Sequence, residues 1–143
     1  MSASMEFLNH IHNKAAANQE LIRGLIGKTE DIEFEKLIFK QAEEYKRVQD
    51  KSAEFINDEF GITKMPGRVS RSMTRLWNAA RTISDNQTEQ IASIIVKTSK
   101  SNIHEMTKML NQYDGGDTKV LDIAGMYINA GEKTVDKLQR YLN

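Results

Sequence analysis

The sequence has 143 residues, and its 20 basic and 20 acidic side chains give a formal net charge of zero. It contains no cysteine, which excludes disulfides and thiolate metal sites. The first residues, "MSASMEFLNHIHNK", have neither the basic start nor the apolar run of a secretory signal, and no stretch approaches the roughly 18 apolar residues that a transmembrane helix needs. We therefore expect a single soluble, cytoplasmic domain over residues 1–143.

Helical periodicity in the first part of the chain predicts two long helices, over about residues 3–26 and 30–60. Gly27 follows the first as a stop signal, and the acidic first turn of the second suits the helix dipole. The apolar stripe of the first helix consists of Leu8, Ile11, Ala15, Asn18, Ile22 and Leu25. The stripe of the second consists of Phe34, Ile38, Gln41, Tyr45, Val48, Ser52 and Phe55.

The only proline, Pro66, marks a linker, after which a short helix is predicted over about residues 68–82. Ser84 or Asp85 is expected to cap a further long helix over about 86–113, which "DGGD" ends. Its stripe consists of Ala92, Ile95, Val96, Ser99, Ile103, Met106, Leu110 and Tyr113. The last helix is predicted over about 118–142, with a stripe of Leu121, Ala124, Ile128, Gly131, Val135, Leu138 and Leu142.

Four long amphipathic helices with one short helix in the middle connection predict an all-α antiparallel bundle. The segments "MEFLNHIHNKAAANQELIRGLI", "EFEKLIFKQAEEYKRVQDKSAEFI", "QIASIIVKTSKSNIHEMTKMLNQY" and "VLDIAGMYINAGEKTVDKLQRYL" resemble ferritin-like four-helix proteins of anaerobic Firmicutes, described mostly as domains of unknown function. The resemblance covers nearly the whole chain and implies the ferritin-like bundle. Catalytically active ferritin-like proteins carry inward Glu residues on two helices and inward Glu-x-x-His motifs on the other two.

The most prominent candidate for a metal ligand is the pair His104 and Glu105 in "SNIHEMTK". At about 100° per residue, His104 falls well over a right angle from the apolar stripe of its helix, beside Lys97, Ser101 and Lys108. Glu105 falls on the other border of that stripe. The pair is therefore expected to lie at the surface.

The other acidic positions do not complete a di-metal pattern. Glu44 is followed three residues later by Arg47, so it does not begin a Glu-x-x-His motif. We therefore expect no di-metal centre and no cofactor. Glu6 with His10, which share a helix face, and Glu44, which flanks the stripe of its own helix, are the alternative metal ligands.

Neutral polar residues occupy the positions where ferritin-like ligands would fall. We expect them to form a buried hydrogen-bonded layer that fixes the helix register, since an unpaired buried polar group costs on the order of 1–3 kcal/mol. A small-ligand cavity at this level is the alternative. The layer consists of Asn18, Gln41, Tyr45, Ser99, Asn102 and Tyr127. Small residues, among them Gly125 and Gly131, are expected to let helix backbones approach closely.

The strongest charge feature is the stretch 61–84, which has five bases and no acid, whereas 29–60 has ten acids and five bases. Arg68, Arg71 and Arg75 share one face of the predicted short helix. They are expected to pair with the acidic helix or with its copy in a homo-oligomer. An acidic protein partner and an anionic membrane or nucleic acid are the alternatives, although zero net charge and the absence of interleaved aromatic residues disfavour a specific nucleic-acid site.

The sequence lacks familiar catalytic motifs. "DGGD" is without the Gly-Lys-Ser/Thr of a phosphate-binding loop, and "HEMTK" is not His-Glu-x-x-His. We therefore expect a non-catalytic structural or protein-interaction bundle. The two alternative functions are a di-iron or manganese protein with an atypical site and an anion-binding or membrane-surface module that uses residues 68–81.

Overall fold

The computed structural model describes residues 2–61 and 87–142, and within these ranges every regular element is a helix. The predicted short helix over 68–82 lies outside the described residues. The all-α class expected from the sequence is confirmed for the described ranges. The elements are α1 (Ala3–Leu25), the 3-10 turn η1 (Ile26–Lys28), α2 (Ile32–Phe60), α4 (Thr88–Gln112), α5 (Thr118–Leu138) and the 3-10 turn η2 (Gln139–Tyr141).

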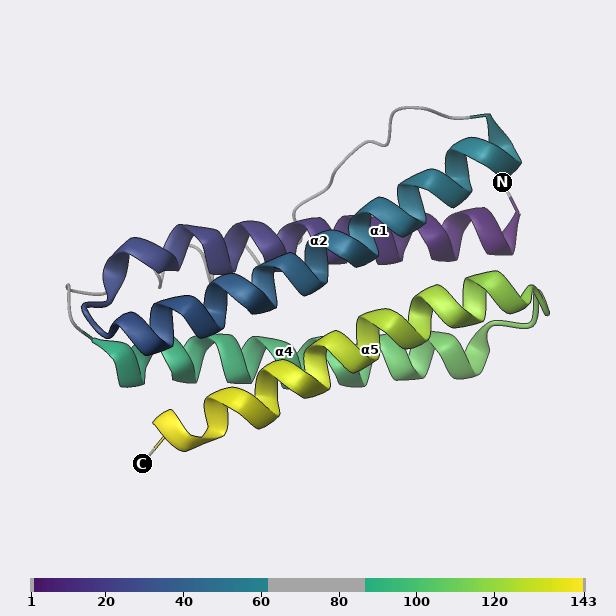
Figure 1. The fold of residues 1–143 in the computed structure, drawn as a ribbon. Coiled ribbons are helices and arrows are strands. Elements are labelled where there is room, and N and C mark those ends of the chain that lie inside the picture. The colour runs from purple at the N-terminus through teal and green to yellow at the C-terminus, as the bar shows by residue number, and fades with distance from the viewer. Residues whose placement is uncertain (1, 62–86, 143) are drawn as a thin grey trace.

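The four long helices pack in two layers of two (Figure 1). α1 and α2 form one layer and run in opposite directions, because η1 and a few residues turn the chain back on itself. α4 and α5 form the other layer and are likewise joined by a short turn. α5 packs against both helices of the first layer, so the hydrophobic core lies between the two layers.

Contacts between distant segments tie the two layers at both ends. Ser4, in the first turn of α1, shares a 2.6 Å hydrogen bond with the hydroxyl of Tyr113 just after α4. At the other end, the hydroxyls of Thr29 and Thr88 are 2.7 Å apart. α1 and α4 therefore run in opposite directions across the layers.

Side-chain and backbone caps set the helix ends. Ser2 and Asp31 accept hydrogen bonds from backbone N–H groups three residues on, at 3.1 and 3.0 Å, so α2 begins at Ile32 and not at residue 30. Gly61 ends α2 in the left-handed conformation, with φ of 68°, which a side chain disfavours. α4 begins at Thr88, two residues later than expected, and the side chain of Gln87 before it makes no capping hydrogen bond. The expected caps, Ser84 or Asp85, lie outside the described residues.

The buried face of α5 differs from the expected stripe. Leu121 is 39% exposed, whereas Val120, Ile123, Tyr127 and Thr134 are buried. The core face is therefore centred on the polar residues Tyr127 and Thr134 and not on the aliphatic residues beside them. Both hydroxyls have partners inside the bundle, which makes this burial possible.

The outer faces of the helices are polar, with few exceptions. Ile32 and Phe39 are 70% and 47% exposed and lie two turns apart on α2. The guanidinium of Arg23 on α1 lies 5.6 Å from the centroid of the Phe39 ring, which it partly covers. Neither α1, α2, α4 nor α5 has an apolar run of the length required to cross a membrane.

Two glycines of α5 serve different purposes. A Cβ on Gly131 would come within 2.8 Å of Ile103 Cγ1, so the missing side chain lets α4 and α5 pack closely there. A Cβ on Gly125 would meet nothing within 4 Å, and Gly125 is exposed. The expectation of close backbone approach is therefore wrong at Gly125.

We expect opposite effects from alanine at these two positions. Gly131→Ala should lower the free energy of unfolding by about 1–3 kcal/mol, because Ile103 or the helix axis must shift. Gly125→Ala should raise it by about 0.5–1 kcal/mol, because alanine is the better helix former in open space. Urea unfolding followed by circular dichroism measures both, and equal effects of the two variants would contradict the packing described here.

Candidate functional site at the middle of the bundle

A hydrogen-bonded cluster of neutral side chains joins three helices in the core. Asn18 of α1 donates from Nδ2 to the Tyr127 hydroxyl of α5 at 2.9 Å and to the Lys14 carbonyl at 2.8 Å. Its Oδ1 accepts from Nδ2 of Asn102 on α4 at 3.0 Å. Asn18, Asn102 and Tyr127 are all buried. Asn18 thus uses both N–H groups and its carbonyl, and it bonds directly to two other helices.

A second cluster joins α2 to α5. Thr134 Oγ1 lies 3.0 Å from Gln41 Oε1 and 2.8 Å from the Ala130 carbonyl, and both side chains are fully buried. Tyr45 and Ser99 are buried beside them. The sequence interpretation missed Thr134. Its spacing of seven residues from Tyr127 is the signal that would have placed both on one helix face.

The two buried phenols are held in the neutral form. Burial raises the pKa of Tyr127 well above 10, and the neighbouring Tyr45, whose ring centroid is 5.8 Å away, raises it further. Burial likewise raises the pKa of Tyr45. Neither hydroxyl therefore supplies a tyrosinate as a base or metal ligand near neutral pH.

The candidate metal ligands do not converge. Glu6 is exposed on α1, and Glu44 is half-buried among charged residues on the outer side of α2. Across residues 2–61 and 87–142, the structure brings no three His, Cys, Asp or Glu side chains together in a group fit to hold a metal ion. Asp and Glu are also absent from the two core clusters, whose members are amides and hydroxyls.

His10 is half-buried, and its acidic neighbour is Glu105. His10 Nε2 is 3.1 Å from Glu105 Oε1, at ion-pair distance but without hydrogen-bond alignment, and Lys14 Nζ is 3.5 Å from the same oxygen. His10 therefore faces α4 and Glu105, where the sequence suggested Glu6 as its partner. His104 is exposed on α4. Glu105 is part of an interhelical charge cluster.

Arg68, Arg71 and Arg75 lie outside the described residues. Their proposed role in anion or partner binding stays a prediction from the sequence.

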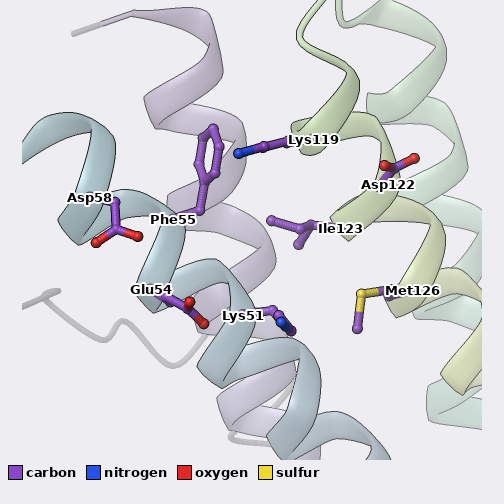
Figure 2. Close-up of a pocket in the computed structure, with 8 residues that line it drawn as sticks. All are labelled: Lys51, Glu54, Phe55, Asp58, Lys119, Asp122, Ile123 and Met126. Carbon is purple, nitrogen blue, oxygen red and sulfur yellow. The ribbon is translucent and has the colours of Figure 1, made fainter.

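Side chains of α2 and α5 line a surface groove, and Figure 2 shows them. The volume of the groove is about 330 Å³. Phe55, Ile123 and Met126 supply its apolar lining, and the ammonium of Lys119 lies 5.8 Å from the centroid of the Phe55 ring. The other lining residues are Lys51, Glu54, Asp58 and Asp122. The groove combines an apolar floor with charges of both signs, and its charged residues form no ion pair with one another.

The charge cluster predicts a contribution of His10 to the pH dependence of stability. Burial, and secondarily the Lys14 charge, lower the pKa of His10 from 6.5 against the opposing effect of Glu105. As the pH falls below 6.5, the unfolded chain therefore binds a proton that the folded chain still excludes, and the free energy of unfolding decreases. His10→Gln should show a smaller loss of stability between pH 7 and 5 than the wild type.

Urea unfolding at a series of pH values measures this difference. His104→Gln removes an exposed imidazole and is the matched control, which should follow the wild-type curve. If His10→Gln loses as much stability as the wild type over this range, the cluster does not hold His10 neutral.

Comparison with known proteins gives no further assignment, since no protein-family model, curated protein or solved structure matches the sequence. Any functional conclusion therefore rests on the described side chains. Their main property is a core whose polar members are neutral and largely bonded to one another.

Proposed function

We propose that this chain is a ferritin-like antiparallel bundle without a di-metal centre, which acts as a non-catalytic structural or protein-interaction protein. The observation that carries the proposal is the bonded cluster of Asn18, Asn102 and Tyr127 in the core. The resemblance to ferritin-like proteins implies that these residues stand where catalytic members of that group hold metal.

The order of the helices supports the ferritin-like assignment. α2 ends at one end of the bundle and α4 begins at the other, which is the arrangement that a single long crossover produces between two hairpins (Figure 1). α1 faces α4 through Ser4 and Tyr113, and α2 faces α5 through Gln41 and Thr134.

The chemistry of the core supports the absence of a di-metal centre. Two divalent ions need about four carboxylates and two imidazoles to balance their charge and fill their coordination shells. The two core clusters offer amides, hydroxyls and phenols kept neutral by burial. These groups already bond to one another, so a metal ion would have to break those hydrogen bonds. Its positive charge would also be buried in a core that has no negative charge to balance it.

The groove between α2 and α5 supports an interaction role (Figure 2). An apolar floor of Phe55, Ile123 and Met126 inside a charged rim is the composition of a small protein-binding surface. Candidate partners are an acidic protein or a second copy of this chain, and the location we propose is the cytoplasm. Of the alternatives drawn from the sequence, a metal site that uses Glu6, His10 or Glu44 is less well supported, because the described residues bring no three potential metal ligands together. The other alternative, an anion-binding module that uses residues 68–81, lies outside the described residues and stays a prediction.

Metal loading tests the proposal. The purified, untagged protein is incubated with ferrous iron, manganese and zinc, desalted and subjected to elemental analysis. We expect less than about a tenth of an equivalent of each metal per chain, because the core offers no anionic ligand set. About two equivalents of iron or manganese would overturn the proposal.

Control variants identify the source of any bound metal. If the protein binds substoichiometric zinc and either His10→Gln or Glu44→Gln abolishes this binding, the zinc belongs to a peripheral site. The core would then still be free of metal. Binding that survives in both variants and disappears in Asn18→Leu would assign it to the core and contradict the proposal.

A further inference from the structure

Two polar groups in the core have no hydrogen-bond partner among the described residues. They are Nε2 of Gln41 and the hydroxyl of Tyr45, on side chains that are 0% and 1% exposed. Gln41 and Tyr45 lie one turn apart on α2, so their side chains share the face that packs against α5. Each such group left unpaired costs on the order of 1–3 kcal/mol.

The surroundings of these two groups are polar and neutral. Gln41 Oε1 lies 3.0 Å from the Thr134 hydroxyl, which leaves its NH2 group free to donate. The hydroxyls of Ser99 and Thr134 lie close enough to Tyr45 to offset part of the rise that burial causes in its pKa, although neither is aligned as a hydrogen bond. The described side chains at this point thus offer donors and hydroxyls but no charge.

We propose that Gln41 and Tyr45 bind an internal water molecule between α2 and α5. The water accepts a hydrogen bond from Gln41 Nε2 and bonds to the Tyr45 hydroxyl, with the Ser99 or Thr134 hydroxyl as a third partner. Buried waters typically make about three such bonds to otherwise unsatisfied polar groups. A charged ligand does not fit, because the described core has no opposite charge to balance it.

A groove between α4 and α5 brings solvent near this position. It has a volume of about 490 Å³, and Ile103 lies in its wall. Ile103 packs over Gly131, and a Cβ built on Gly131 would lie 3.5 Å from the Tyr45 hydroxyl. Ile103 and Gly131 therefore lie between this groove and the Tyr45 hydroxyl. This site is separate from the cluster of Asn18, Asn102 and Tyr127, and its existence does not depend on the proposed function.

Magnetic relaxation dispersion of water ¹⁷O counts long-lived internal waters and tests the site. The wild type is compared with the double variant Gln41→Leu/Tyr45→Phe. This variant removes the two unpaired polar groups and leaves apolar side chains of similar shape. We expect the double variant to hold one long-lived water fewer, because a buried water needs polar partners and apolar cavities stay dry. Tyr127→Phe is the matched control, since the hydroxyl it removes already bonds to Asn18, and it should keep the wild-type count.

An equal count in the wild type and the double variant would overturn the proposal. If the double variant does not fold, the wild type alone decides by NMR. A direct nuclear Overhauser effect between water and the side-chain amide protons of Gln41 supports the site, and its absence in a spectrum where those protons are resolved contradicts it.

Discussion

The bundle depends on one constraint, which is that polar side chains placed in its core must find partners there. Asn18 meets this constraint most fully, because its amide bonds to Tyr127 on α5, to Asn102 on α4 and to the backbone of its own helix. A shift of any of these helices by one turn would move a residue by about 5.4 Å and separate the partners. The apolar residues around the cluster supply most of the driving force for packing, but they tolerate such shifts far better than directional bonds do.

The same constraint bears on chemistry. A core that balances two metal ions carries several carboxylates, and such carboxylates repel one another unless the metal is present. Here the buried polar side chains are amides, hydroxyls and phenols, and burial keeps the phenols of Tyr45 and Tyr127 neutral. The charged residues that the sequence suggested as ligands lie at the periphery, where His10, Lys14 and Glu105 form a cluster between α1 and α4.

The sequence predicted the helical class and the buried faces of α1 and α2 well. In both helices, apolar residues at intervals of three and four define a single face that can be buried. Leu8, Ile11, Phe34 and Ile38 are all buried as expected. On α5 it placed Ala124, Gly131 and Leu138 in the core correctly but chose the exposed Leu121 and missed Thr134. Periodicity alone does not show that a hydroxyl will find a partner in the core. The contact of His10 with Glu105 was also missed, because the two residues are brought together only by the packing of α1 on α4. Of the candidate site, the burial of the polar residues followed from their spacing, whereas the identity of their partners required the fold.

The central claim is that Asn18 and its partners hold the helices in register, and a double-mutant cycle tests it most directly. Asn18→Leu and Asn102→Leu are each measured by urea unfolding, singly and together. Each single variant should lose about 1–3 kcal/mol, because it leaves a buried amide unpaired. The double variant should lose less than the sum of the two by at least about 0.5 kcal/mol, since the second change removes the orphaned partner. Single variants near wild-type stability, with effects that add to within about 0.3 kcal/mol, would contradict the account.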